Sequence, residues 1–337
     1  MARTLPNHAD LIDYEHAVAG HDGILRDADG ELFIKPCTAA EIAFYESSRA
    51  YHPEFVEHMP NFLGSLTLDQ QQNGTTIEEA GAALIAKHSI PEVVVPKRDN
   101  NRKIATKQAI VLENAAHGFV KPNIMDLKLG VRLWADDALQ EKKARFDKLS
   151  DETTHKDLGF RIAGMRVYQG PNAVGKDIDA GGHKIYDRDY GRLTIHKDNV
   201  QEAFRDFIFI KSAGIDEELG KLVTQAFLAD VSRIQEILEA QESRMFSSSL
   251  LFVFEGDGAA LRSAMEEASK PPATLANGDA NSEEDDDEDE NPRPKIYDVK
   301  IIDFAHADWT PGEGPDENSL KGVRSVVNIL QELSESG

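Results

Sequence analysis

The sequence predicts an α+β fold built as two lobes that join near Glu113. Short apolar runs bounded by turn residues occur early in the chain, and such runs are typical of strands. Longer segments with apolar residues at helical spacing occur later. With 337 residues, 40% of them hydrophobic, the chain is long enough for one large domain or for two lobes around a cleft.

The first third of the chain contains three expected strands and one helix. A turn at 27–30 precedes a strand at 31–35 that Pro36 closes. Thr38 can cap a helix over 38–52, in which Ile42 and Tyr45 recur at helical spacing. Further strands are expected at 62–68 and 107–112, and the polar stretch 74–101 between them predicts an exposed insertion.

From Gly118 onward, strands alternate with longer helices. The order predicted after the strand at 122–129 is a charged helix at 134–149, a strand at 160–168 and helices at 198–212 and 215–242. The longer of these helices has an apolar face of Leu219, Leu222, Val223, Ala226 and Val231. Strands at 249–255 and 296–304 and a helix at 319–333 complete the order. Between them, about 269–294 predicts a disordered acidic loop, because Glu283–Glu290 is an unbroken acidic run.

Composition limits the classes of partner and environment. The net charge of −23 disfavours nucleic acid and anionic membrane surfaces as default partners, so no direct nucleic acid binding is expected. The absence of a long apolar run predicts a soluble intracellular protein without a transmembrane segment. The single cysteine, Cys37, excludes an intrachain disulfide framework. Residues 97–166 hold 15 basic against 10 acidic residues, which suits either a compact polyanion or a solvated basic helix face.

The most informative segment is Pro122–Gly130, where an acid and a base stand two residues apart in an apolar run. Because strand side chains alternate between faces, Asp126 and Lys128 point the same way and Met125, Leu127 and Leu129 point toward a core. This pattern fits a polar site, and it also fits a half-exposed strand whose Asp and Lys are merely solvated. The segment alone leaves both readings open.

Four blocks, in order along the chain, resemble the signatures of the inositol polyphosphate kinase family. The segment 122–130 has the form P-x-x-x-D-x-K-x-G, and 159–168 resembles the G-F-R-I-x-G-M stretch. The strand at 247–256 resembles the S-S-L-L element, and 302–306 resembles I-D-F-A-H. The resemblance implies a protein-kinase-like fold with an antiparallel-sheet N-lobe at 1–113, a mixed C-lobe at 114–337 and nucleotide bound between them. No Walker-type phosphate loop is present.

The resemblance also implies roles in nucleotide binding and catalysis. Lys35 would contact the nucleotide phosphates beneath a loop containing Gly20 and Gly23, and the backbone of the hinge residues Glu113, Asn114 and Ala115 would bind adenine. Asp126 would contact the nucleotide, including its ribose. Asp303 follows an apolar run, where an acid is costly unless it is paired or binds metal, and the family makes it the Mg²⁺ ligand.

The substrate side of the expected site is basic. Lys128 matches the lysine that reaches the inositol phosphate and the reacting hydroxyl, where a cation stabilises charge on the transferring phosphoryl group. His306 matches a histidine near the substrate. The family grips substrate phosphates with a basic helix, here carrying Lys142, Lys143, Arg145 and Lys148. Arg188 stands where some members place a polar substrate contact.

Within the family, the short chain most resembles the fungal multikinase branch, which uses ATP and Mg²⁺ to convert inositol tris- and tetrakisphosphates to the pentakisphosphate. That resemblance also allows action on phosphoinositide head groups and implies a nuclear location, with the cytoplasm as a second compartment. An alternative is an inositol hexakisphosphate kinase that forms pyrophosphates. Another is a scaffold or transcription cofactor that binds a basic protein through Glu283–Glu290. Product analysis separates the multikinase from the hexakisphosphate kinase, and deletion of the acidic tract tests the scaffold role.

Overall fold

The computed structural model describes residues 11–14, 18, 23–67, 106, 108–270 and 294–335. The insertion expected at 74–101, the acidic tract Glu283–Glu290 and the predicted phosphate-loop residue Gly20 lie outside these residues. None of the helices in the described part of the chain is long and apolar enough to cross a membrane.

Two five-stranded antiparallel sheets form the framework, and the α+β fold class is thereby confirmed. In the order of their pairing, the first sheet contains β1 (Ile12–Asp13), β2 (Leu25–Arg26), β3 (Leu32–Pro36), β5 (Gln108–Glu113) and β4 (Phe62–Thr67). The second contains β11 (Tyr297–Ile302), β10 (Ser249–Glu255), β6 (Pro122–Leu129), β7 (Phe160–Tyr168) and β8 (His183–Tyr186). A short pair joins β9 (Ser243–Met245) to β12 (Ala307–Trp309).

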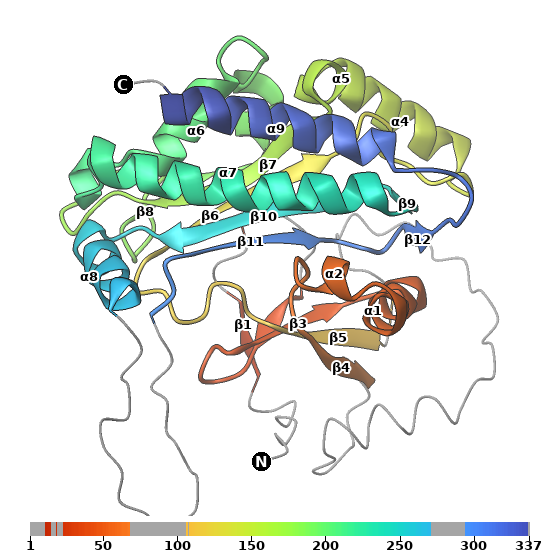
Figure 1. The fold of residues 1–337 in the computed structure, drawn as a ribbon, viewed down its shortest axis with the longest axis horizontal. Helices are drawn as coiled ribbons and strands as arrows, with labels where there is room; N and C mark the ends of the chain where they lie inside the picture. The colour runs from red at the N-terminus through yellow and green to blue at the C-terminus, as the bar shows by residue number, and fades with distance from the viewer. Residues whose placement is uncertain are drawn as a thin grey trace, which may run out of the picture.

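Helices cover the outer face of the second sheet, and the first sheet lies on its other side (Figure 1). The first sheet belongs to the small lobe and the second to the large lobe. The small lobe carries α1 (Ala39–Tyr51) and α2 (Pro53–Val56). The large lobe carries α4 (Gln140–Asp151), α5 (Thr154–Leu158), α6 (Val200–Ile208), α7 (Glu217–Ala240), α8 (Gly258–Ser269) and α9 (Glu317–Glu335), with short turns η2 (Tyr190–Thr194) and η3 (Lys211–Ala213). Side-chain caps begin three of them: Thr38 at α1, Asp216 at α7 and Asp257 at α8.

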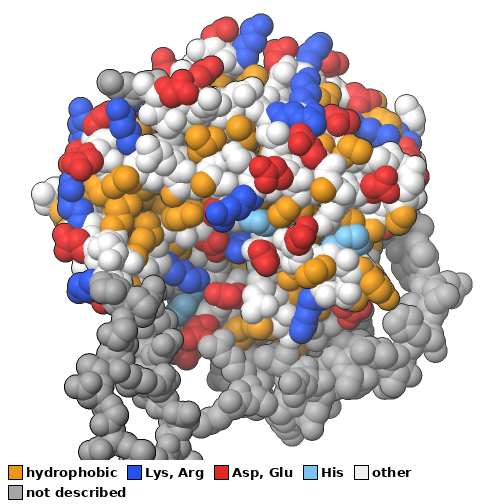
Figure 2. Space-filling model, viewed as in Figure 1, with side chains coloured by type: hydrophobic (Ala, Val, Ile, Leu, Met, Phe, Trp, Pro, Cys, Tyr) orange, Lys and Arg blue, Asp and Glu red, His pale blue; other side chains and the backbone are white. Residues whose placement is uncertain are grey.

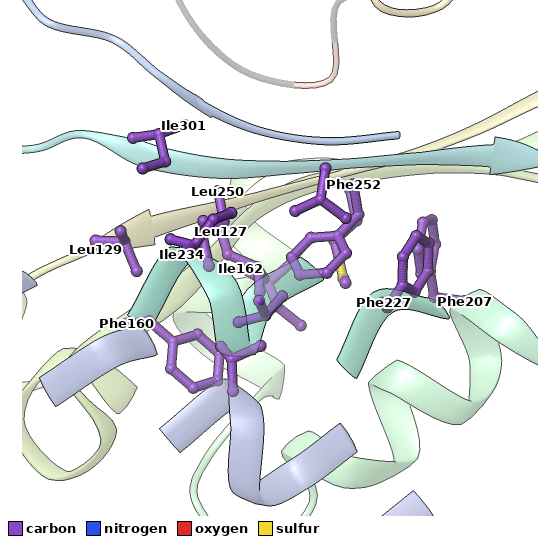
Figure 3. Packing of buried hydrophobic residues seen from close by; sticks show 14 of the residues in the cluster. Leu127, Leu129, Phe160, Ile162, Phe207, Phe227, Ile234, Leu250, Phe252 and Ile301 are labelled. Atoms are coloured by element: carbon purple, nitrogen blue, oxygen red, sulfur yellow. The ribbon is translucent and has the colours of Figure 1, made fainter. Parts of the chain in front are cut away.

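The core explains which way the residues of β6 face. Met125, Leu127 and Leu129 are fully buried in the large cluster between the second sheet and its helices, and Figure 3 shows Leu127 and Leu129 on that side with Phe227 and Ile234 of α7. Because strand side chains alternate, Asp126 and Lys128 face the opposite side, toward the small lobe. The sheet thus places one acid and one base where the two lobes meet.

An aromatic cluster joins the lobes directly behind this face. The ring of Phe44 in α1 stacks on Phe304 at 4.8 Å and on Trp309 at 5.1 Å between centroids. The backbone N–H of Ile301 donates to the carbonyl of His58 at 2.7 Å. These contacts hold the end of β11, and with it Asp303, against the small lobe.

The charged helix differs from the sequence prediction of 134–149, because α4 begins at Gln140. Side chains occupy the backbone carbonyls that an earlier turn of helix would need. Arg132 Nε donates to the carbonyl of Trp134 at 3.0 Å, and Lys143 Nζ donates to that of Asp136 at 2.8 Å. The segment 134–139 therefore turns before the helix starts.

Two smaller expectations also fail, and a helix was missed. The helix predicted at 198–212 ends at Ile208 and continues only as the short turn η3. Leu222, placed on the apolar face of the longer helix, is 45% exposed, since that face is rotated toward Phe227, Ile234 and Leu238. Helix α8 was not predicted at all, although Asp257 caps it by accepting from Ala259 and Ala260 N–H at 3.0 Å.

Candidate active site

A cleft that is open to solvent lies between the two sheets. Its walls are apolar and come from both lobes, with Phe33 and Leu112 on one side and Ile124, Leu251 and Val253 on the other. Six residues that the sequence analysis assigned to nucleotide, metal or catalysis line this one cleft: Lys35, Glu113, Asn114, Ala115, Asp126 and Asp303. An apolar slot with polar groups at one end suits a flat heterocycle that carries phosphates.

Asp303 links the two lysines at the polar end. Its Oδ1 lies 2.7 Å from Lys35 Nζ, and its Oδ2 lies 3.0 Å from Lys128 Nζ. Lys35 comes from β3 of the small lobe and Lys128 from β6 of the large lobe, so one carboxylate joins cations from both lobes. The lysine of the nucleotide cleft is therefore connected to the lysine expected at the acceptor.

The electrostatics of this group favour the fully charged forms. Burial alone would raise the pKa of Asp303, but the adjacent Lys35 and Lys128 ammoniums lower it below its ordinary value. Burial would likewise lower the pKa of Lys35, but the carboxylates of Asp303 and Glu41 raise it above its ordinary value. Asp303 thus stays ionised, which leaves its carboxylate able to bind a cation.

Glu41 is a functional candidate that sequence reasoning missed. It lies in the first turn of α1, is 1% exposed, and its Oε1 is 3.0 Å from Lys35 Nζ. The only signal in the sequence was an acid six residues after a strand-end lysine, and an acid in a first helical turn is common for capping reasons. The helix holds Lys35 from behind while Asp303 holds it from the large lobe.

Asp126 is buried on the cleft face and behaves differently from Asp303. Burial raises its pKa, with Lys128 and Arg161 opposing that effect and Asp303 adding to it. Its Oδ1 is buried and has no hydrogen-bond partner among the residues that the structure describes. An unsatisfied buried oxygen beside a cleft is suited to accept a hydrogen bond from a ligand hydroxyl.

The hinge is fixed by Asn114. Its side chain donates to the carbonyl of Gly30 at 2.7 Å and accepts from Tyr14 Oη at 3.1 Å and from Ala116 N–H at 3.0 Å. Its backbone N–H donates to the carbonyl of Glu31 at 2.8 Å. The N–H of Glu113 likewise donates to the carbonyl of Asn61 at 2.9 Å, so a base would meet the carbonyl of Glu113 and the backbone of Ala115.

Gly23, which the sequence assigned to the loop over the phosphates, has φ of 92°, a conformation that glycine adopts without strain. Val18, which precedes this loop, lies against Gly164 of β7. Gly164 pairs with Asp126 of β6 in the register of the sheet. A Cβ at Gly164 would lie 2.0 Å from the carbonyl oxygen of Val18. This close approach requires glycine in β7.

The basic helix contributes unequally. Lys142 Nζ lies 3.3 Å from Nε2 of His306, so these two predicted substrate residues meet, and burial followed by the charge of Lys142 lowers the pKa of His306. The structure does not bring the others to the same point. Lys143 lies over the ring of Trp134 at 4.7 Å, Arg145 is exposed beside Phe146, and Lys148 pairs loosely with Glu152 at 3.7 Å.

A divalent ion would rely on Asp303 and on ligand oxygens. No group of three or more His, Cys, Asp or Glu side chains that could hold a metal occurs in the part of the chain that the structure describes. Mg²⁺ is commonly bound through one or two carboxylates together with nucleotide phosphates. The ionised carboxylate of Asp303 at the phosphate end of the cleft fits that donor set, and Asp126, whose Oδ1 is free among the described residues, lines the same cleft.

The cleft between the lobes is apolar, and at its polar end Lys35 pairs with Glu41 of α1 and with Asp303. This arrangement is that of a kinase. Comparison with known proteins identifies the family of kinases. The model of the inositol polyphosphate kinase family matches residues 109–331. The chain therefore belongs to the inositol polyphosphate kinase family, as the four sequence blocks indicated.

Individual relatives agree with this placement. The inositol polyphosphate multikinase of Saccharomyces cerevisiae is 32% identical over 95% of this chain and 97% of its own. Human inositol hexakisphosphate kinase 1 is 30% identical, over 67% of this chain and 52% of its own length. The crystal structure of the S. cerevisiae multikinase Ipk2 with ADP and Mn²⁺ superposes with a TM-score of 0.61 and 27% identity, covering 90% of this chain and 99% of that one.

Proposed function

We propose that the protein is an inositol polyphosphate multikinase, which transfers the γ-phosphate of ATP to inositol tris- and tetrakisphosphates and so forms the pentakisphosphate. The observation that carries the proposal is the bridge Lys35–Asp303–Lys128, which connects the nucleotide cleft to the basic acceptor side. The similarity to the S. cerevisiae multikinase over nearly the whole of both chains supports it further.

In this proposal the cleft binds ATP with adenine at the hinge. The backbone groups of Glu113 and Ala115 would bind the base between Leu112 and Val253, and the free Oδ1 of Asp126 would accept a hydrogen bond from a ribose hydroxyl. Lys35, held by Glu41, would contact the phosphates. The adenine would thus occupy the apolar end of the cleft and the phosphates its charged end.

Transfer depends on positioning and on neutralising charge. Mg²⁺, held by Asp303 and the phosphates, would neutralise charge on the transferring group. Lys128 stands beside Asp303 on the acceptor side, where its ammonium would orient the attacking hydroxyl and stabilise negative charge that develops during transfer. Lys128 and Asp303 already lie 3.0 Å apart in the structure, so little reorganisation would accompany the step.

The acceptor would bind along the edge between β6 and α4. Lys142 and His306, which contact each other, would form the inner part of that surface. Lys143 and the exposed Arg145 and Lys148 would form an outer basic rim. A nuclear location and action on phosphoinositide head groups are part of the same proposal, and they rest on the family resemblance alone.

A product assay tests the proposal directly. Purified protein with ATP and Mg²⁺ would be offered inositol 1,4,5-trisphosphate and, in a separate reaction, hexakisphosphate. Products would be separated by phosphate number over time, with Lys128→Ala protein as the inactive control. Successive tetrakis- and pentakisphosphate peaks are expected. A single tetrakisphosphate peak would indicate a dedicated trisphosphate kinase. Consumption of hexakisphosphate instead would assign the chain to the pyrophosphate-forming branch.

A further inference from the structure

Arg161 is a buried cation that the nucleotide cleft does not use. It lies on β7, is 5% exposed, and is absent from the residues that line the cleft. In the register of the sheet it stands directly opposite Lys128 of β6, and paired residues of antiparallel strands project from the same face. Arg161 therefore lies beside Lys128, on the side away from Ser249 of β10.

Its hydrogen bonds leave most of the guanidinium unused. Nη1 donates to the carbonyl of the adjacent Ile162 at 3.0 Å, and the buried Nε has no partner. No carboxylate among the described residues forms an ion pair with Arg161. The contrast with Arg166 on the same strand is direct, because Arg166 is buried to the same degree and its Nε and Nη2 lie 2.9 and 2.8 Å from Asp179.

A second arginine, Arg192, is brought to the same place by the turn η2. A Cβ at Gly191 would lie 1.9 Å from the carbonyl oxygen of Ile162, so only glycine lets the turn sit this close on β7. Arg192 also has a buried Nε without a partner, and no acidic side chain of the described chain pairs with it. Burial, and next the charge of Arg192, lowers the pKa of Arg161 to about 10.

Two neighbouring arginines that form no ion pair are costly in a protein interior, even with the charge of Asp126 near Arg161, and the cost falls when an anion binds. The planar guanidinium matches a phosphate group through paired N–H donors. We infer that Arg161 and Arg192 form an anion subsite beside Lys128 that takes a phosphate group of the acceptor. The inference rests on the proposed function, since it concerns the acceptor side of that site.

The phosphate bound here belongs to the acceptor and not to ATP because of where the pair lies. Lys35 and Asp303 meet the nucleotide phosphates on the cleft side, whereas Arg161 is separated from them by the Lys128 position in the row Ser249–Lys128–Arg161. Arg161 is one strand beyond Lys128, so it would meet a phosphate next to the reacting hydroxyl of a polyphosphorylated ring. The pair would thus orient the ring.

The test is binding of inositol 1,4,5-trisphosphate, and separately of hexakisphosphate, to ADP-loaded protein by calorimetry. Arg192→Gln is the primary variant because Arg192 is only half-buried, and Arg161→Lys, which keeps the charge and loses the fork, is the second. Each should raise the Kd of the inositol phosphate at least about tenfold, as expected for a lost charged hydrogen bond. Arg205→Gln, which removes a surface partner of Glu217, should leave the Kd unchanged.

Steady-state kinetics separate the sources of phosphate. In Arg192→Gln the KM for the inositol phosphate should rise while the KM for ATP stays the same. An unchanged Kd, or a rise confined to ATP, would overturn the inference. If wild-type protein binds inositol phosphates with this arginine dependence but transfers no phosphate, the proposed function fails and the subsite stands.

Discussion

Ser247 and Asp303 share a backbone conformation that no other non-glycine residue in the described part of the chain adopts, with φ of 62° and 70°. Both also bind the same ammonium. The carbonyl of Ser247 accepts from Lys128 Nζ at 2.9 Å, and Asp303 Oδ2 lies 3.0 Å from it. Left-handed backbone at a residue with a side chain costs about 1–3 kcal/mol and tends to occur where the surrounding structure fixes a functional group.

Ser247 is the easier of the two to test, because its hydroxyl donates to the carbonyl of Leu133 at 2.9 Å and its side chain takes no other part in the site. Ser247→Gly should change the free energy of unfolding by no more than about 1 kcal/mol, since relief of strain offsets the lost hydrogen bond. Ser247→Val should destabilise by about 1–3 kcal/mol, because a β-branched residue disfavours this φ.

The activities of these two variants should differ in the same order as their stabilities. Ser247→Val displaces the carbonyl that holds Lys128, so kcat should fall while KM for ATP stays the same. Ser247→Gly should keep most of kcat. Chemical denaturation and steady-state kinetics measure both effects, and equal kcat in the two variants would show that the carbonyl does not position Lys128.

Asp303→Asn removes the one charge that separates Lys35 from Lys128. Transfer should fall by at least about 10²–10³-fold, because the carboxylate proposed to bind the metal is lost and the two cations are left without their common partner. Unfolding should also become easier, by about 1–3 kcal/mol, less than for a fully buried pair since a quarter of the Asp303 side chain is exposed. Single-turnover assays and denaturation measure these changes. Asp157→Asn, at an exposed position on α5, is the control and should match wild type.

Lys128→Met tests the division between nucleotide binding and transfer. The methionine keeps the apolar stem and removes the ammonium, so transfer should fall by about 10²–10³-fold. Binding of ADP should change little, because Lys128 does not line the nucleotide cleft. Titration calorimetry and product assays give the two readouts, with Lys321→Met on the outer face of α9 as a matched control. Loss of ADP affinity equal to the loss of turnover would place Lys128 on the nucleotide instead.

The sequence predicted the parts of this arrangement that depend on local pattern. Alternation in 122–130 correctly placed Asp126 and Lys128 on the face opposite Leu127, because one buried face fixes the register of a strand. Glu41, Ser247 and Arg161 were not predicted as site residues. Ser247 and Arg161 join the site through contacts distant in sequence, which residue type and spacing do not reveal. Glu41 is only six residues from Lys35, but an acid in a first helical turn is common for capping reasons.

The basic helix shows the opposite failure. Four cations on one segment predicted a common phosphate grip, yet Lys143 and Lys148 turn to local partners. All four lie within α4, where successive side chains point about 100° apart, so they cannot all reach one point. Charge pattern located the surface, and only the tertiary structure decided which cation reaches His306.

Acid sensitivity should come in part from His155, a buried residue of α5 whose ring Nδ1 lies 2.7 Å from the carbonyl of Gly130, the last residue of the segment that carries Lys128. Burial, with Arg161 next in importance, lowers the pKa of His155 to about 3. In the unfolded chain the pKa returns to about 6.5. Between these two values the unfolded state binds the extra proton, so the free energy of unfolding must rise with pH up to about 6.5 and level off above it.

At pH 5 this single residue should lower the free energy of unfolding by about 2 kcal/mol relative to pH 7.5, since the unfolded histidine is protonated there and the folded one is not. His155→Gln should remove that part of the pH dependence, even if its stability at pH 7.5 is lower because the bond to Gly130 is altered. The matched change at the exposed His196 should leave the wild-type slope intact. Urea denaturation at half-unit steps from pH 5 to 8 measures the slopes. A His155→Gln slope as steep as that of wild type would mean that His155 is already protonated in the folded protein.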